Sequence, residues 1–266
     1  MTPTPDGDDA RVIALVVATL AVGIPLDALG PLGSQTVVNL WTWGALLWVV
    51  WHSTTLHRRE LAACVVLATL GELFLMEVWG LYHYRLLNLP LFIPPGHALV
   101  FTAAMRLSRR VPDWFPWAVF AGGAVYVAYA ASTGIDTQGL IWFAVLAGFM
   151  KWGREQNLYG VAFMIALVVE TYGTSLGGWR YHPVEPWFGL TTTNPPVFVG
   201  AIYCTLEVMV RRLSKVEPQF EGAAAAEEVA EDVLTNLRVT DVDHLQRQGS
   251  VAASHLEPHA GRAIHQ

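Results

Sequence analysis

Residues 158–182 read LYGVAFMIALVVETYGTSLGGWRYH, an uncharged apolar run that ends at Glu170 and then passes into glycine and aromatic residues. A helix rises 1.5 Å per residue, so about 20 apolar residues cross the roughly 30 Å hydrocarbon core of a bilayer. The run is therefore predicted to belong to a membrane span over 158–179, with a carboxyl group inside it.

The rest of the chain has the same apolar character. Of its 266 residues 53% are hydrophobic and only 14% are charged, and the mean hydropathy is +0.39. A typical soluble domain carries about 25% charged residues. The composition thus predicts an all-α, polytopic bundle of transmembrane helices. Eight spans are expected, near 11–30, 35–55, 60–84, 90–109, 114–133, 138–152, 158–179 and 193–213.

The distribution of basic residues predicts the orientation of these spans. With eight spans and a cytoplasmic N-terminus, only Arg85 and Arg180 fall on the outer side. The inner side collects Arg11, Arg58, Arg59, Arg106, Arg109, Arg110, Lys151, Arg154, Arg211, Arg212 and Lys215. Because cytoplasmic loops carry an excess of Lys and Arg, both termini are expected in the cytoplasm and the protein in the plasma (inner) membrane.

The chain divides into three predicted regions. Residues 1–10 form a cytoplasmic N-terminus, 11–213 the transmembrane domain, and 216–266 a mostly disordered cytoplasmic tail with little apolar content. The net charge of −6 arises mainly from the chain ends and gives no indication of a nucleic-acid partner. Cys64 and Cys204 lie inside predicted spans without disulfide or metal spacing, so buried free thiols are expected.

An internal repeat is visible when 60–110 is placed over 158–212. Glu72 then aligns with Glu170, WGLYHY with GGWRYH, and IPPGHALVF with NPPVFVGAIY. This alignment predicts two parallel four-helix halves, about 11–110 and 114–213, related by an axis along the membrane normal. The proline pairs at 94–95 and 195–196 are expected to begin spans four and eight, because proline suits the first helical turn.

The glutamates are the strongest candidates for chemistry. An ionisable group inside a span costs roughly 2.5–3.5 kcal/mol or more and usually faces a cavity or the bundle interior. A carboxyl group in an apolar site favours its neutral form and can then act as a general acid. We therefore take Glu170, Glu72 and Glu77 as candidate catalytic residues. The alternative is that they are neutral side chains joining neighbouring helices.

Residues around the two glutamate motifs are candidates for substrate binding. Gly173 and Gly177 follow Glu170 on one helical face and leave a groove for a ligand or for another helix. Aromatic faces attract cations and could line a chamber, although they could equally belong to the membrane interface. The candidates are Trp79, Tyr82, Tyr84, His97, Gly173, Gly177, Trp179, Tyr181 and Asn194. The loop HPVEPWFGLTTTN is either a lid or an ordinary surface loop.

Several reaction types lack their sequence signatures. The chain has no di-iron histidine series, no aspartate pair for Mg²⁺-diphosphate, no Walker motif, no nucleophile elbow and no HExxH. No metal and no cofactor are expected. A metal held by Glu72 or Glu77 together with His83, His97 or His182 remains a minor alternative.

The segment ETYGTSLGGWRYHPVEPWFGLTTTNPPVFVGAIYC, residues 170–204, resembles the integral-membrane carotenoid-biosynthesis proteins. This family includes hydratases that add water to the terminal double bond of an acyclic carotenoid. The resemblance is carried by Glu170, Gly173, Gly177 and Tyr181 and by the proline-led final span. It covers roughly 158–212, with a weaker echo at 71–100. Where the family has Phe-Gly before the tyrosine, this chain has residues 178–180, Gly-Trp-Arg. The resemblance implies an acid-type enzyme that acts on a polyene or isoprenoid, with Glu170 as the residue carried over.

The leading hypothesis is an intramembrane hydratase or cyclase that acts on a carotenoid or other isoprenoid double bond. Its expected partners are a lipophilic small molecule, the lipid bilayer and other membrane biosynthetic enzymes. The rival hypotheses are a proton-coupled transporter of a small or lipophilic solute and a non-catalytic membrane partner in isoprenoid biosynthesis. A transporter needs a polar path to both faces. The inner halves of spans three and seven offer few polar side chains, which favours the enzyme.

Overall fold

The structure is a computed structural model of the chain, and it describes residues 5–214. The predicted disordered tail, 216–266, lies outside the described residues. Within them, eight α-helices dominate, which confirms the all-α class. They are α1 Pro5–Leu29, α2 Ser34–Trp51, α3 Thr55–Leu73, α4 Ile93–Leu107, α5 Phe115–Thr133, α6 Gly139–Trp152, α7 Gln156–Ser175 and α8 Gly200–Ser214. A π-helical turn, η1 Phe74–Val78, continues α3, and a 3₁₀ turn, η2 Val197–Val199, precedes α8.

Four stretches of the described chain are long and apolar enough to cross a membrane. They are Asp9–Leu29, Thr55–Val78, Phe115–Thr133 and Gln156–Ser175, and they coincide with the odd-numbered helices. Large apolar side chains stand exposed on the helix surfaces, Leu40 and Val125 among them. A bilayer would cover such a surface. The structure therefore indicates a helical membrane protein.

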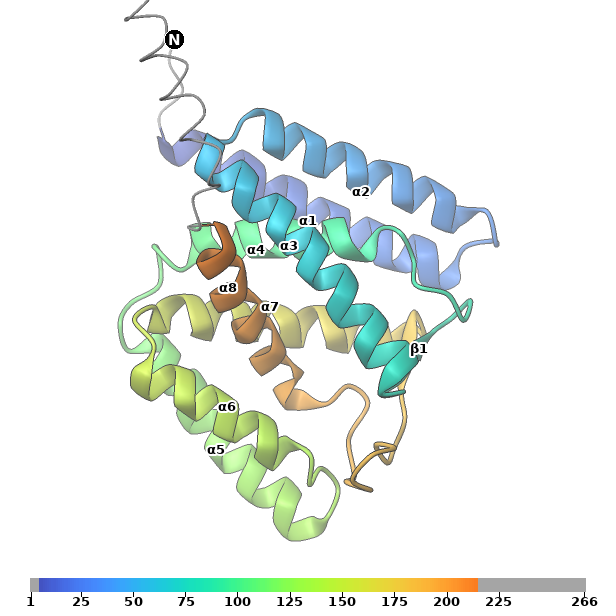
Figure 1. Cartoon of the computed structure of the whole chain (residues 1–266), viewed down its shortest axis with the longest axis vertical. Helices are drawn as coiled ribbons and strands as arrows, with labels where there is room; N and C mark the ends of the chain where they lie inside the picture. The colour runs from blue at the N-terminus through green and yellow to red at the C-terminus, as the bar shows by residue number, and fades with distance from the viewer. Residues whose placement is uncertain (1–4, 215–266) are drawn as a thin grey trace, which may run out of the picture. The chain divides into compact units, whose positions relative to one another are not determined.

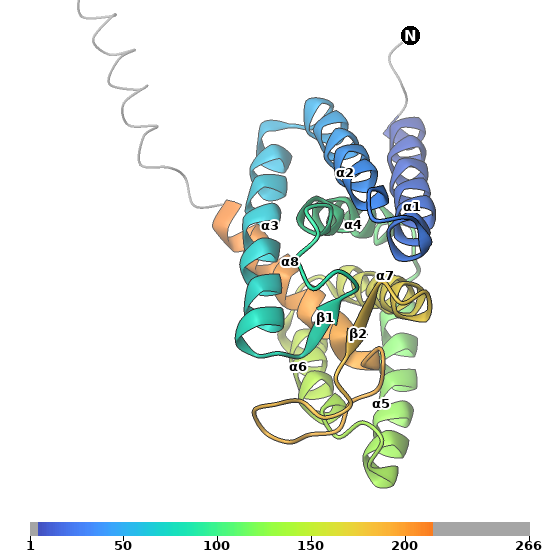
Figure 2. The ribbon, with the colours of Figure 1, turned by 90° about the vertical axis from the view of Figure 1, so that its right-hand side faces the viewer.

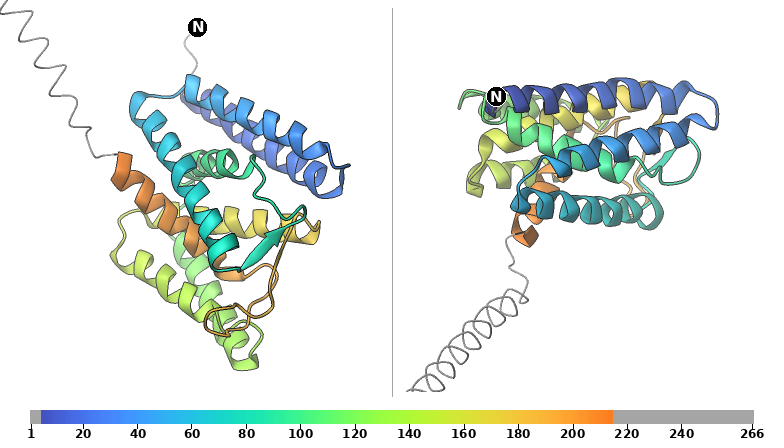
Figure 3. Two further views of the ribbon diagram at one scale, coloured as in Figure 1. Left: turned by 45° about the vertical axis from the view of Figure 1, so that its right-hand side comes forward. Right: turned by 90° about the horizontal axis from the view of Figure 1, so that it is seen from above.

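The helices form a central group with a pair on each side. Helices α3, α4, α7 and α8 pack against one another, the α1–α2 pair packs on α4, and the α5–α6 pair packs on α7 and α8 (Figures 1 and 3). In Figure 1 the odd-numbered helices run from left to right and the even-numbered helices return. We call the right-hand end, where two short strands lie, the sheet end, and the opposite end the basic end.

Local signals explain several helix ends. Pro94 and Pro95 stand in the first turn of α4, and Pro116 in that of α5, as the proline preference for this position predicts. The side chain of Thr54 accepts a hydrogen bond from the backbone N–H of His57 at 3.3 Å and caps α3. The prediction that Pro195-Pro196 begins the last span is wrong in detail, because α8 starts at Gly200, after η2.

A two-stranded antiparallel sheet joins distant parts of the chain at the sheet end. Strand β1, Tyr82–Tyr84, pairs with β2, Trp179–Tyr181, with Tyr82 opposite Tyr181 and Tyr84 opposite Trp179. Figure 2, viewed from this end, shows the strands side by side. Single helices running to 84 and to 179 were predicted here, and this prediction is wrong. The backbone φ angles of 71° at Gly80 and 77° at Gly177 turn the chain out of each helix.

Candidate functional site

An apolar chamber lies inside the sheet end of the bundle, between the sheet and helices α1, α2, α3, α4, α7 and α8. Its empty space is about 890 Å³, including the part open to the outside. The centre of a water molecule can occupy only about 90 Å³ of it, so the chamber is narrow as it stands. Aliphatic side chains such as Leu20, Ile24 and Val100 make up much of its wall. The polar and aromatic groups in the wall are Thr19, Thr42, Glu72, Tyr82, Tyr84, Phe92, His97, Glu170, Trp179, Tyr181 and Tyr203.

Glu72, near the end of α3, is held by both tyrosines of β1. Its Oε2 accepts hydrogen bonds from the hydroxyls of Tyr82 at 2.5 Å and of Tyr84 at 2.6 Å. Its other oxygen, Oε1, lies 3.4 Å from Nε2 of His97 on α4. The residue is 8% exposed. A free tyrosine has a pKa near 10, so at neutral pH both hydroxyls are protonated and act as donors.

Glu170 on α7 has the equivalent arrangement with β2. Its Oε2 accepts hydrogen bonds from Nε1 of Trp179 at 2.7 Å and from the hydroxyl of Tyr181 at 3.0 Å. Within residues 5–214 no hydrogen bond is formed by its Oε1, although the residue is only 7% exposed. Glu170 therefore has one oxygen fixed by two donors and a second oxygen left to the chamber.

The sheet brings these two sets of donors together. Successive strand residues point to opposite sides, so Tyr82, Tyr84, Trp179 and Tyr181 all face inward and are buried. The rings of Tyr82 and Tyr181 lie 4.9 Å apart, and those of Tyr84 and Trp179 lie 6.0 Å apart. One continuous aromatic layer thus connects the two carboxyl groups.

The glycines after Glu170 make room for the aromatic layer and do not leave an open groove. A Cβ atom on Gly173 would lie 1.9 Å from Cη2 of Trp179, so the indole ring fills the space beside the glycine. The predicted groove is therefore occupied by the chain's own tryptophan. Gly177 supplies the left-handed turn that ends α7, and a Cβ atom at that position would have no neighbour within 4 Å.

Three other predicted site residues do not line the chamber. Glu77 is exposed on η1. Trp79 points elsewhere: its Nε1 donates to Oε2 of Glu185 at 2.9 Å, and its ring stacks on Trp187 at 5.0 Å. Asn194 contacts β2 instead. Its Oδ1 accepts a hydrogen bond from the backbone N–H of Tyr181 at 3.0 Å and so holds the strand in place.

Tyr203 on α8 was missed by the sequence reasoning. It lines the chamber, and its ring stacks on His97 with 5.0 Å between centroids and 10° between planes. The described residues provide no hydrogen-bond partner for its hydroxyl, which leaves the hydroxyl available to a ligand. The signal was a single tyrosine in the apolar first turn of α8, GAIYC.

Glu185 was also missed, inside the loop 183–192. It is 1% exposed and accepts hydrogen bonds from Trp79 and from the backbone N–H groups of Trp187, Phe188 and Leu190. Burial raises the pKa of this carboxyl, but the hydrogen bonds outweigh burial and leave the pKa below its ordinary value. None of the described residues of this loop lines the chamber, so the loop is held by its own glutamate rather than closed over the site.

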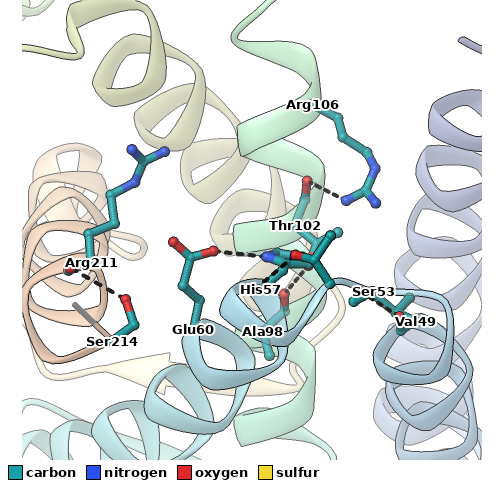
Figure 4. A network of polar contacts seen from close by, with 10 residues as sticks. Val49, Ser53, His57, Glu60, Ala98, Thr102, Arg106, Arg211 and Ser214 are labelled. Atoms are coloured by element: carbon teal, nitrogen blue, oxygen red, sulfur yellow. Dashed lines mark hydrogen bonds and ion pairs between the residues drawn. The ribbon is translucent and has the colours of Figure 1, made fainter. Parts of the chain in front are cut away.

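A second polar network lies near the basic end (Figure 4). Nδ1 of His57 lies 2.9 Å from Oε2 of Glu60, and Nε2 of the same ring lies 3.4 Å from Oγ1 of Thr102. Nearby on α8, Glu207 is 4% exposed, and its Oε2 is buried without a hydrogen-bond partner. Glu207 stands close to the inner end of the predicted span 193–213.

The described residues contain no group of three or more His, Cys, Asp and Glu side chains placed to hold a metal ion. His97 approaches Glu72, but His83 and His182 lie on the opposite face of the sheet, with their rings 5.4 Å apart. Cys64 and Cys204 are buried free thiols, as predicted.

The chamber therefore combines apolar walls with two anchored carboxyl groups, an imidazole and a tyrosine hydroxyl. Such a set can hold and transfer protons beside an apolar ligand. Comparisons with protein-family models, with curated proteins and with solved structures found no match for this chain.

Proposed function

We propose that this chain is an intramembrane acid catalyst that protonates a carbon–carbon double bond of an isoprenoid-type substrate and then hydrates or cyclises it. One observation carries the proposal. Glu72 and Glu170 both face an apolar chamber, and each is fixed by two aromatic donors from the adjoining sheet. A substrate with polar groups would find few partners in such walls, whereas a hydrocarbon chain matches them.

Glu170 is the proton donor in this proposal, because its Oε1 faces the chamber without a partner. The proton adds to the less substituted carbon of the double bond, and the positive charge forms at the more substituted carbon. Water then forms a C–O bond at that carbon, and its extra proton passes to Glu72 or His97, which lie 3.4 Å apart. The product is a tertiary alcohol, heavier than the substrate by one water.

Cyclisation follows the same first step. A second double bond of the substrate attacks the cation, and a proton is lost from a neighbouring carbon to Glu72, which gives an isomer of equal mass. The faces of Tyr82, Trp179 and Tyr203 stabilise the cation, by about 0.5–2 kcal/mol per ring or more when water is excluded. Neither branch changes the oxidation state of the substrate overall, so the reaction as written needs no redox cofactor.

We also propose that all eight helices cross the membrane, as two four-helix halves near 11–110 and 114–213. The four long apolar helices all run in one direction, so the shorter even-numbered helices must return the chain across the bilayer. The repeated arrangement of a buried glutamate, a short strand and its donors supports the two halves. The excess of Lys and Arg at the basic end favours a cytoplasmic location for that end and for both termini, in a plasma (inner) membrane.

The test is mass spectrometry of lipid extracts from an isoprenoid-producing host. The host carries the wild-type chain, Glu170→Gln or Glu77→Gln, with equal amounts of each protein verified in the membrane. Glu170→Gln keeps the size of the side chain and removes the acid. Glu77→Gln is the matched control, because that glutamate is exposed outside the chamber. A product heavier by one water, or an isomer of equal mass, should appear with the wild type and the control and vanish with Glu170→Gln. Identical extracts from all three would contradict the proposal for the isoprenoids present.

A second candidate function is a proton-coupled transporter, and one observation favours it. Helix α8 carries buried Glu207, whose Oε2 has no partner, beside the His57–Glu60 pair near the basic end of the bundle. Ionisable groups near both ends of one bundle are a feature of proton-coupled carriers. Solute uptake driven by a pH gradient, abolished by Glu207→Gln while the lipid products stay unchanged, would favour this function over the enzyme.

A further inference from the structure

The outward face of the sheet is chemically opposite to its inward face. His83 of β1 lies opposite Arg180 of β2 in the register, and both point away from the chamber. Arg85 follows directly after β1, and its backbone N–H bonds to the carbonyl of Gly178 at 2.9 Å, which extends the sheet. A hollow next to this face is lined by His83, Arg85, Thr174, Ser175, Leu176, Gly177, Trp179, Arg180 and Asn194.

The basic residues at this end of the bundle gather at that one hollow. Arg85 and Arg180 are the only Lys or Arg residues at the sheet end of the chain between 5 and 214, and both line it. The others in this range lie towards the basic end: Arg11, Arg58, Arg59, Arg106, Arg109, Arg110, Lys151, Arg154, Arg211 and Arg212. Two guanidinium groups and an imidazole thus meet at a surface otherwise poor in cations.

The guanidinium groups keep donors that the described residues do not use. Arg85 donates from Nη1 to the carbonyl of Gly30 at 3.4 Å, while its Nε and Nη2 are buried without a hydrogen-bond partner. An opposite charge lies nearby on Asp27 of α1, whose Oδ1 is also buried without a partner and forms no ion pair with Arg85. Arg180 is exposed and forms no ion pair with any residue in the described range.

We infer that this hollow binds a phosphate-type oxyanion, either the headgroup of an anionic lipid or a free phosphate. The planar fork of an arginine matches the oxygens of a phosphate group, and charge-assisted hydrogen bonds of this kind are about twice as strong as neutral ones. The Ser175 hydroxyl and the Asn194 amide can supply further contacts. The site does not depend on the chemistry of the chamber, although Trp179 lines both.

The experiment measures binding by the purified full chain in phosphatidylcholine nanodiscs. In one arm, phosphatidylglycerol is added to the nanodiscs and retained lipids are counted by native mass spectrometry. In the other arm, inorganic phosphate is titrated and followed by calorimetry. The variants are Arg180→Gln, Arg180→Lys and Arg85→Gln. Arg212→Gln is the control, because it removes the same charge from an exposed position at the basic end.

The wild type and Arg212→Gln should bind at least one of the two probes. Arg180→Gln should weaken that binding about tenfold or more, the effect of losing one charge-assisted hydrogen bond. The affinity of Arg180→Lys should lie between those of the wild type and Arg180→Gln, because lysine keeps the positive charge but lacks the planar guanidinium fork. Retention of phosphatidylglycerol without phosphate binding identifies a lipid headgroup, and phosphate binding identifies a free anion. Binding of neither probe, or equal losses in Arg180→Gln and Arg212→Gln, would overturn the inference.

Discussion

Replacing Gly173 by alanine should break one of the two anchors of Glu170 without touching the glutamate itself. The new Cβ would lie 1.9 Å from one ring atom of Trp179 and 2.3 Å from two others, so the indole ring must move. That movement breaks the 2.7 Å hydrogen bond from Nε1 of Trp179 to Glu170. A buried carboxyl oxygen that loses one of its donors costs about 1–3 kcal/mol, and overpacking costs about 1–3 kcal/mol. Alanine has the higher helix propensity, which offsets about 1 kcal/mol of this loss.

The expected result is a loss of about 1–5 kcal/mol in the free energy of unfolding, measured by denaturant titration in detergent. Gly44→Ala is the control, because α2 offers nothing within 4 Å of its Cβ, and it should be neutral or slightly stabilising. In a Trp179→Ala background the ring is gone, so Gly173→Ala should no longer destabilise the protein. If Gly173→Ala were as stable as the wild type with Trp179 present, the packing described for the chamber would be incorrect.

Three further predictions concern the turn, the loop and β1. Gly177→Ala should cost about 1–2 kcal/mol in thermal unfolding, because the backbone φ of 77° strains any side chain even where space is open. The folded pKa of Glu185 is below its ordinary value of 4.5, so its stabilising effect is complete above that value and is lost as the pH falls through the folded pKa. Amide hydrogen exchange at Trp187 should therefore accelerate in acid beyond its intrinsic dependence, and Glu185→Gln should abolish this acid response. Tyr84→Phe should destabilise by about 1.5–3 kcal/mol, because Glu72 loses one of its two hydroxyl donors in a buried site; an unchanged midpoint in denaturant would contradict this.

The helices and the two glutamates of the chamber were predictable from the sequence, although Glu77 was named with them and is exposed. Long apolar runs fix the helices, because the bilayer core sets their length. The carboxyl groups of Glu72 and Glu170 stand out as ionisable side chains inside such runs. The alignment of the two segments placed both strands in equivalent stretches of chain, but one residue out of register, because it set Tyr82 on Arg180 and not on a donor to Glu170.

The remaining features depend on tertiary contacts that no local pattern encodes. Strands of three residues are too short to show a period, so β1 was taken as a helix end and most of β2 as the start of a loop. Whether Gly173 leaves a groove or accepts a ring depends on where Trp179 lies. The partner of Trp79 is Glu185, 106 residues away, which sequence spacing cannot indicate. Tyr203 reaches the chamber only because α8 packs between α3 and α7.

Glu72 and Glu170 each find their donors in their own stretch of chain, between 9 and 12 residues downstream. This has a consequence for biogenesis. A polar group that enters hydrocarbon without a partner costs several kcal/mol, and a newly synthesised segment cannot wait for partners that have not yet been translated. Glu72 can be satisfied by Tyr82 and Tyr84 as soon as residue 84 leaves the ribosome, long before the second glutamate exists. The order of the residues therefore allows each of these two carboxyl groups to pair during insertion, and only the contact between β1 and β2 must wait until residues 179–181 have been made.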